Sequence, residues 1–291
     1  MKAEILLQAA ALGLMQGGVY ALVAAGLTLI YGVMNIVNFA HGEFVTLGMY
    51  LALFGFATLG IDPYAFAPLV VIAVFLLGLA IHRLCIQPAL DHPQINQMLI
   101  TIGVSTVVIG LMQMLWGANM AVIRTAYARE ALSLGSVRIT YTRLIAFAVA
   151  MMVTGGFWYF LKHTKLGMAI RAVAQAPSSA LLVGIDVAAI QRYTFALGLS
   201  LAALAGALVG SIFFINPTVG IDLFLLPAFV IVVLGTMGNF IGALVGGIII
   251  GLVEALAGVI LGASLRQLAS LTLFVLILLF MPRGLFGGRR R

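Results

Sequence analysis

Residues 5–30 read ILLQAAALGLMQGGVYALVAAGLTLI, an apolar run without a charged side chain. An α-helix needs roughly 20 consecutive apolar residues to cross the hydrocarbon core of a bilayer, so this run is long enough to span it. The run is also too long for the apolar segment of a signal peptide, and no small-residue cleavage site follows it. We therefore expect it to form a retained first membrane span.

Similar apolar runs recur along the chain. They cover residues 44–59, 64–84, 95–116, 143–161, 193–215, 240–261 and 268–281, with a shorter piece at 226–236. Of the 291 residues, 64% are hydrophobic and 8% are charged, whereas soluble domains have about 45–50% and about 25%. This composition excludes a soluble globule. The runs are continuous rather than alternating, which favours helices over barrel strands. We predict an all-α fold with one domain over residues 1–291, a polytopic helical bundle of about eight transmembrane helices plus a short broken helix.

The positions of Lys and Arg indicate the orientation, because these residues accumulate in loops on the cytoplasmic side of a membrane. They place both the loop at residues 162–192 and the C-terminus on that side, with Lys162, Lys165, Arg171 and Arg192 in the loop and Arg283, Arg289, Arg290 and Arg291 at the end. Two segments on the same side of a membrane must be separated by an even number of crossings, and three long spans lie between these two. The short piece at 226–236 must therefore count as a crossing or half-crossing. We therefore expect a broken helix there.

The same count places residues 117–142 outside, although this external loop carries Arg124, Arg129 and Arg138. Two short alternating runs flank Gly135-Ser136, which predicts a small β-hairpin. The loop is either a contact surface for a partner or a solvated connector.

The sequence lacks the motifs of common enzyme classes. It contains no P-loop, no nucleophile elbow and no His-Glu-x-x-His metal motif. The four histidines lie at span ends, and Cys85 is the only cysteine. We therefore expect neither catalysis nor a bound cofactor in this chain, which cannot itself be an ATP-driven motor. The basic residues form no continuous patch, so we expect no nucleic-acid partner.

Two polar positions interrupt the apolar pattern. Asn38, His41 and Glu43 lie in a polar break between two apolar runs, and Glu254 lies near the middle of residues 240–261. Such groups are costly in hydrocarbon unless they face protein or a wet cavity. The first three line a cavity, or they belong to an ordinary connector in which Asn38 caps a helix and Glu43 lies on its first turn. Glu254 is either a functional group or a hydrogen-bonded structural one.

Glycines spaced by four recur inside the spans, at Gly13/Gly17, Gly206/Gly210, Gly238/Gly242/Gly246, Gly247/Gly251 and Gly258/Gly262. This spacing lets helix backbones approach closely. We predict tight helix packing at these positions.

The loop at residues 163–186 predicts two short helices. Leu166, Ile170 and Val173 recur at helical spacing, Pro177 suits the first turn of a second helix, and Gly184 suits its end. The pair is either a docking surface for a partner or a pair of helices lying on lipid headgroups.

Several stretches of the chain resemble a known family. They are GLTLIYGV at 26–33, NFAHGE at 38–43, KLGMAIRA at 165–172, GID at 184–186, and GTMGN at 235–239, which leads to Glu254. Together they resemble the LivH-type permease subunits of branched-chain amino acid ABC importers, and the resemblance covers nearly the whole chain.

The resemblance implies a multi-pass permease of the bacterial inner membrane, in contact with membrane lipid. Its expected partners are a second, LivM-like permease, two cytoplasmic ATPase subunits that bind the ATP, and a periplasmic substrate-binding protein. It implies that the loop at 162–192 couples to an ATPase through Lys165, Gly167, Arg171, Ala172, Gly184 and Asp186. Asn38, His41, Glu43 and Glu254 are the candidates for the substrate path.

Two alternatives to this function stay open. One is a urea or short-amide permease of the same family, because the matching blocks do not fix the substrate. The other is a self-contained channel or ion-coupled carrier, which would need several intramembrane charges as ion sites, whereas only Glu254 is clearly mid-span.

Overall fold

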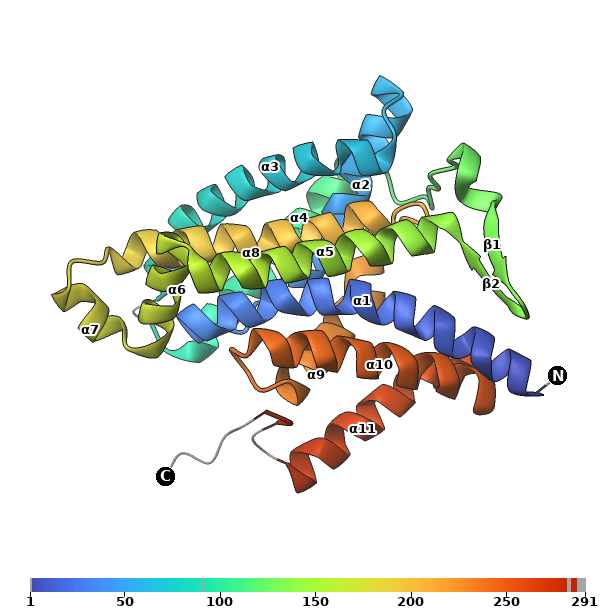
Figure 1. Cartoon of the computed structure of the whole chain (residues 1–291). Coiled ribbons are helices and arrows are strands. Elements are labelled where there is room, and N and C mark those ends of the chain that lie inside the picture. Colours follow the sequence, from blue (N-terminus) through green and yellow to red (C-terminus); the bar gives the residue numbers. More distant parts are fainter. Residues whose placement is uncertain (1, 91, 282–283, 287–291) are drawn as a thin grey trace.

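The computed structural model describes residues 2–90, 92–281 and 284–286 (Figure 1). Arg283, Arg289, Arg290 and Arg291, on which the orientation of the C-terminus was predicted, lie outside these residues. The described α-helices are α1 (Lys2–Met34), α2 (His41–Leu59), α3 (Pro63–Ile81), α4 (Gln94–Trp116), α5 (Tyr141–His163), α6 (Lys165–Gln175), α7 (Pro177–Leu182), α8 (Val187–Val209), α9 (Leu226–Leu234), α10 (Phe240–Ile260) and α11 (Arg266–Phe280). Two strands, β1 (Ala131–Leu134) and β2 (Val137–Thr140), form a hairpin.

Eight helical segments of the described chain are long and apolar enough to cross a membrane. They are Ala3–Met34, His41–Leu59, Pro63–Ala89, Gln94–Trp116, Tyr141–His163, Val187–Val209, Phe240–Ile260 and Ala263–Phe280. This confirms the predicted all-α polytopic bundle with about eight spans.

The predicted broken helix is a shorter apolar segment, Ile221–Leu234. It begins with a π-helical turn, Ile221–Leu225, and continues as α9. The predicted span at 193–215 is displaced by six residues, because α8 begins at Val187 and ends at Val209, and a loop follows. In that loop Ile215 exchanges two backbone hydrogen bonds of 2.9 Å with Ala121, which ties the loop to the segment after α4. The apolar residues 210–215 therefore extend the hydropathy pattern of α8 without extending the helix.

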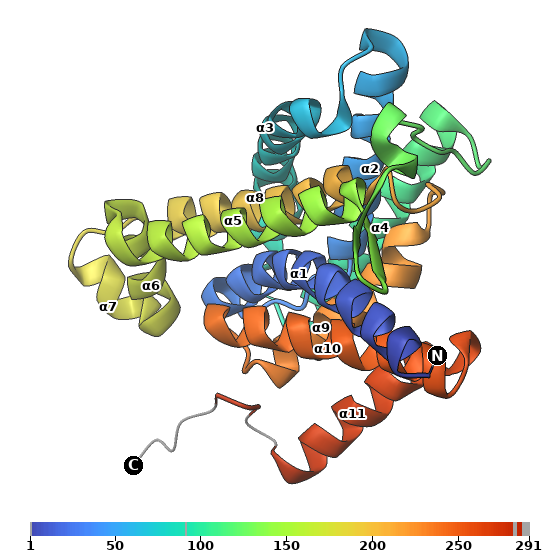
Figure 2. The same ribbon diagram turned by 45° about the vertical axis from the view of Figure 1, so that its right-hand side comes forward.

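Helix α1 runs through the bundle and packs against α10, α8 and α5 (Figures 1 and 2). Most of α1 and α8 is buried, whereas α4, α5 and α11 leave most of their residues uncovered. The uncovered side chains are largely apolar, among them Leu111, Met152 and Leu279. An apolar surface of this extent is typical of contact with lipid or another membrane subunit.

Close glycine contacts hold the central helices together, as the four-residue spacing predicts. A Cβ atom added at Gly17 would lie 2.8 Å from the carbonyl oxygen of Gly247, and one at Gly13 would lie 2.7 Å from that of Gly251. In α8, a Cβ atom at Gly206 would overlap the carbonyl oxygen of Val45 in α2. Hence α1 meets α10, and α2 meets α8, at backbone contact distance.

The prediction of tight packing is wrong for the last glycine pair. A Cβ atom at Gly258 would meet only the flexible side chain of Arg266, at 3.8 Å or more. Gly262 has open space around it, and its φ of +101° shows that glycine is needed there for the turn into α11.

The hairpin and the α6–α7 pair lie at opposite ends of the bundle (Figure 1). The hairpin confirms the pattern around Gly135-Ser136, with Ala131 opposite Thr140 and Leu134 opposite Val137. At the other end, α6 and α7 are the two predicted short helices. Pro177 is the first residue of α7, and Gly184 follows it with a φ of +82°. The sequence therefore predicts the hairpin and the two short helices correctly.

Candidate functional site

The connection between α1 and α2 brings Asn38, His41 and Glu43 together. All three side chains are fully buried. Asn38 Oδ1 accepts a hydrogen bond of 3.1 Å from the backbone N–H of Ala40, and Glu43 Oε1 accepts one of 2.5 Å from the Ser105 hydroxyl of α4. Glu43 lies on the first turn of α2, as the connector interpretation predicts, but the prediction that Asn38 caps this helix is wrong, because the N-cap residue is Ala40 and Asn38 instead stabilises the turn before it.

This connection lies inside the bundle. His41 Nε2 is 2.9 Å from the carbonyl oxygen of Val23. Val23 precedes Met34, the last residue of α1, by about three helical turns. The first turn of α2 therefore lies level with the middle of α1 instead of beside its end.

Each of these three side chains also keeps one buried polar atom without a hydrogen-bond partner among the described residues. These atoms are Asn38 Nδ2, His41 Nδ1 and Glu43 Oε2. Buried polar atoms usually have partners, including water, so such atoms call for an explanation. The cluster thus fixes the turn and still has unused hydrogen-bonding capacity.

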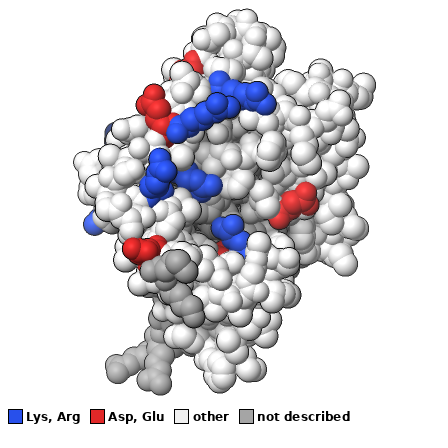
Figure 3. Space-filling model, turned by 90° about the vertical axis from the view of Figure 1, so that its right-hand side faces the viewer, with Lys and Arg blue, Asp and Glu red and all other residues white. Residues whose placement is uncertain are grey.

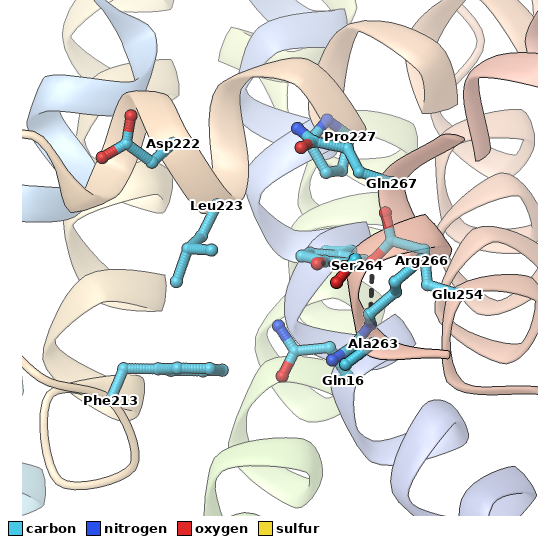
Figure 4. A pocket seen from close by; sticks show the side chains of 11 residues that line it. Gln16, Phe213, Asp222, Leu223, Pro227, Glu254, Ala263, Ser264, Arg266 and Gln267 are labelled. Atoms are coloured by element: carbon cyan, nitrogen blue, oxygen red, sulfur yellow. Dashed lines mark hydrogen bonds and ion pairs between the residues drawn. The ribbon is translucent and has the colours of Figure 1, made fainter. Parts of the chain in front are cut away.

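Glu254 forms a second polar cluster, on α10. Its carboxylate is buried and accepts a hydrogen bond of 2.8 Å from the Tyr20 hydroxyl. The Nε atom of Arg266, at the start of α11, lies 3.8 Å from Glu254 Oε2 (Figure 4). A charged donor and a hydroxyl compensate part of the cost of burying a carboxylate. Glu254 is therefore held in place mainly by the Tyr20 hydroxyl, 234 residues away in sequence.

Both clusters contact α1. Tyr20, which binds Glu254, and Val23, which binds His41, are three residues apart, or less than one helical turn. Asp222, in the π-helical turn before α9, lies near both clusters. It lines a cavity together with Glu254, and its negative charge acts on the Glu43 carboxylate. None of Asn38, His41 and Glu43 lines that cavity.

The cavity beside Glu254 has a volume of about 210 Å³. Its wall combines polar residues (Gln16, Tyr20, Asp222, Glu254, Ser264, Arg266 and Gln267) with apolar ones (Phe213, Leu223, Pro227 and Ala263). A second cavity of about 320 Å³ shares Glu254 and Arg266 and adds Arg143 and Gln8. The Glu254–Arg266 pair therefore borders two adjacent cavities.

Sequence reasoning did not identify Tyr20, Asp222 or Arg266 as site residues. Tyr20 carried no signal, because its partner is 234 residues away. Asp222 and Arg266 did carry one, since each is an isolated charge beside an apolar run.

The α6–α7 pair joins α5 to α8 at one end of the bundle. The Thr164 hydroxyl caps α6 by accepting a hydrogen bond of 3.0 Å from the N–H of Gly167. Gly167, Ile170 and Val173 are buried against the bundle. Leu166, the remaining residue of the predicted apolar face, is partly buried and packs against the core.

The opposite face of this pair is uncovered. Lys165 and Arg171 are exposed, and Arg171 donates a hydrogen bond of 3.2 Å to the carbonyl oxygen of Lys162. Ala172 is half-buried, and Asp186 caps α8 by accepting a hydrogen bond of 3.0 Å from the N–H of Ala189. Apolar side chains are exposed as well, at Met168, Leu181, Leu182 and Val183. The surface therefore combines positive charge with uncovered apolar groups.

The loop at the hairpin end is attached to the bundle. The Gln8 side chain exchanges hydrogen bonds of 2.7 and 2.8 Å with the backbone of Arg138 in β2. The Tyr127 hydroxyl donates to the Asp62 carboxylate, and burial together with this contact raises the pKa of Tyr127 above its usual value. Lys and Arg side chains gather in the middle of this end, and smaller groups of Asp and Glu side chains lie around them (Figure 3).

Residues 9–281 match the family described as "Branched-chain amino acid transport system / permease component". The chain belongs to this permease family. The match confirms the resemblance drawn from the sequence blocks, and it makes the chain a multi-pass membrane permease.

Individual relatives agree with the family assignment. The permease is 31% identical to the high-affinity branched-chain amino acid transport system permease protein BraD of Pseudomonas aeruginosa, with 94% of each chain covered. It is 30% identical to LivH of Escherichia coli, with 94% of this chain and 93% of that one covered. A probable branched-chain amino acid permease LivH of Methanocaldococcus jannaschii is 28% identical over 91% of this chain.

A solved structure has a similar fold. PsaBC from Streptococcus pneumoniae in complex with Fab superposes with a TM-score of 0.52 and covers 95% of the permease and 93% of its own chain. The sequence identity is 11%, so this likeness concerns the fold alone.

Proposed function

We propose that this permease is the transmembrane subunit of an ATP-binding-cassette importer for branched-chain amino acids in the bacterial inner membrane. The observation that carries the proposal is the family match over residues 9–281, together with relatives of that name that align over more than nine-tenths of the chain. The partners we propose are a second, LivM-like permease, two cytoplasmic ATPase subunits that bind the ATP, and a periplasmic substrate-binding protein.

We place residues 162–192 on the cytoplasmic side, with α6 and α7 as the docking surface for an ATPase subunit. Positive charge at Lys165 and Arg171 supports this orientation. The exposed apolar groups at Leu181, Leu182 and Val183 suit a protein partner, because a surface helix rarely leaves such a group uncovered. Gly184 and Asp186 then set the position of α7 relative to α8.

Coupling follows from how α6 is attached. Its buried face at Gly167, Ile170 and Val173 fixes it to the end of the bundle, so a displacement of α6 is passed to α5 and α8. ATP-driven closure of two ATPase subunits would shift α6 and switch the path between outward and inward access. Arg171 and Ala172 lie on the part of α6 that would meet the ATPase.

The opposite end, with residues 117–142, then faces the periplasm, where the substrate-binding protein delivers its amino acid. The charged side chains on this end (Figure 3) suit a polar, reversible contact of this kind. Arg124, Arg129 and Arg138 in this loop run against the usual charge bias, and a partner with acidic groups would account for them.

For the substrate path we propose the buried polar groups Asn38, His41, Glu43 and Glu254, and we add Asp222, which lines the cavity beside Glu254. Unpartnered atoms on the first three residues support this role, as does the cavity beside Glu254. The path should bind weakly, because a membrane site that held a zwitterion tightly would release it slowly.

The proposal is tested by affinity purification of the tagged permease from its native host in mild detergent, with mass spectrometry of the subunits recovered. Recovery of two P-loop ATPases and a second permease supports an importer, and leucine binding by the co-encoded binding protein supports the substrate class. An intact, monodisperse permease without partners supports a self-contained carrier instead. Preference of the binding protein for urea or short amides would overturn the substrate class alone.

A further inference from the structure

The wall of the cavity beside Glu254 contains a pair of opposite charges, Glu254 and Arg266. Its charged pair is incomplete, because Arg266 Nε approaches Glu254 Oε2 only to 3.8 Å and the Arg266 side chain is 45% exposed. The Glu254 side chain is 4% exposed and bound firmly by Tyr20. One partner of the pair is thus buried and hydrogen-bonded, whereas the other is nearly half exposed.

A zwitterion has the charges that would replace this weak contact. An ammonium group beside Glu254 would supply the cation that Arg266 supplies at present. Arg266, turned toward the cavity, would then offer its planar guanidinium to a carboxylate, which it can bind through two parallel hydrogen bonds. The ammonium group of an α-amino acid is therefore complementary to Glu254, and its carboxylate is complementary to Arg266.

The remainder of the cavity wall is suited to an aliphatic side chain. Phe213 and Leu223 lie across the cavity from Arg266 and Gln16 (Figure 4), and Pro227 contributes a further apolar surface. The carboxylate of Asp222 accepts a hydrogen bond of 2.9 Å from the Thr218 hydroxyl, so it is already engaged on its own side of the cavity. Apolar walls with a few convergent polar groups are typical of small-molecule sites.

We propose that this cavity is a binding site for an aliphatic α-amino acid, whose ammonium group pairs with Glu254 and whose carboxylate pairs with Arg266, while its side chain contacts Phe213, Leu223 and Pro227. This inference rests on the proposed function and deepens it, because it assigns the substrate's three groups to named residues. Tyr20 is a positioning residue, since it holds the Glu254 carboxylate toward the cavity.

The test uses the single cysteine of the chain. In a Cys85→Ala background, Ser264→Cys places a thiol on the cavity wall at a residue to which the proposal assigns no substrate contact, and Leu261→Cys places one on an exposed position outside the cavity as the control. The complete transporter is purified in detergent with each variant, and the rate of modification by a maleimide is measured during a titration with L-leucine. The presence of ATPase subunits is checked first on the same preparation, and leucine uptake is checked after part of it has been reconstituted into proteoliposomes.

With L-leucine at about ten times its dissociation constant, modification at position 264 should slow about tenfold, because about one site in eleven stays free. The rate at position 261 should stay constant. Isoamylamine, which lacks the carboxylate, and 4-methylpentanoate, which lacks the ammonium, should protect far less. Glu254→Gln and Arg266→Gln should each abolish protection, and Glu254→Asp should restore part of it, which separates a role in binding from a role in folding.

Equal modification rates with and without L-leucine, in a preparation that still takes up leucine, would overturn the site and leave the proposed function standing. Protection by isoamylamine as strong as that by L-leucine would overturn the pairing with Arg266. A preparation without ATPase subunits or uptake contradicts the proposed function itself.

Discussion

Gly167 offers a quantitative test of the connection between α6 and the bundle. A Cβ atom added there would lie 2.5 Å from the carbonyl oxygen of Phe160 and 2.6 Å from the Cα atom of Leu161. Ordinary contacts begin at 3.4 Å, so in Gly167→Ala the start of α6 must move away from α5 by up to 0.9 Å, from 2.5 to 3.4 Å. The atoms it meets are backbone at the end of a helix, and they cannot rotate aside.

The energetic effect has two parts of opposite sign. Overpacking costs about 1–3 kcal/mol, and alanine in place of glycine in a helix returns about 1 kcal/mol. The net cost of keeping α6 in its position is therefore up to about 2 kcal/mol, or up to roughly 30-fold in the population of the docked state. We expect uptake per ATP hydrolysed to fall by up to that factor while ATP hydrolysis itself continues.

The assay measures leucine uptake and ATP hydrolysis on the same proteoliposomes, with the melting temperature of each complex in detergent. Gly155→Ala in α5 is the matched control, because a Cβ atom there meets nothing within 4 Å. It should leave uptake unchanged and the melting temperature equal or slightly higher. Wild-type uptake per ATP and wild-type stability in Gly167→Ala would refute both the tight contact and the coupling role of α6.

Three further outcomes follow from the same contacts. Glu254→Gln should lower uptake at least tenfold while the subunits still assemble, and Tyr20→Phe should have a smaller effect of the same kind, since it removes one hydrogen bond worth about 1–3 kcal/mol; normal uptake by Glu254→Gln would make this carboxylate structural. Gly206→Ala should destabilise the permease by about 1–3 kcal/mol, seen as a lower melting temperature, whereas Gly110→Ala, with open space around it, should not; equal melting temperatures would contradict the α2–α8 contact. Gly184→Val should uncouple hydrolysis from uptake, because φ is +82° there and a β-branched residue strains such a backbone by about 1–3 kcal/mol; unchanged uptake would remove Gly184 from the coupling surface.

Much of the fold follows from properties that the sequence carries locally. The length of each apolar run predicts the spans, and the spacing of Leu166, Ile170 and Val173 with Pro177 predicts the α6–α7 pair. The broken helix at Ile221–Leu234 follows from counting crossings between two basic segments, although its π-helical start does not. Local signals fail where the apolar pattern continues past the end of a helix. At Val209 the helix α8 ends, but the following residues are still apolar.

The candidate site is harder to predict, because its groups come together through tertiary contacts. The sequence marks Glu254 and the break around His41 as unusual, yet it cannot show that Tyr20 binds the first and Val23 the second. It also cannot show that the connection before α2 turns back to the middle of α1. Arg266 is visible only as a charge at the start of α11 until the fold brings it to α10.

The central claim, that this permease moves branched-chain amino acids by using ATP hydrolysed on partner subunits, is tested most directly by reconstitution. The purified complex is placed in proteoliposomes with the binding protein and labelled L-leucine outside and with ATP at the ATPase side. The account predicts leucine accumulation that requires ATP, the ATPase subunits and the binding protein. Leucine accumulation by this permease alone, driven by a sodium or proton gradient, would contradict it.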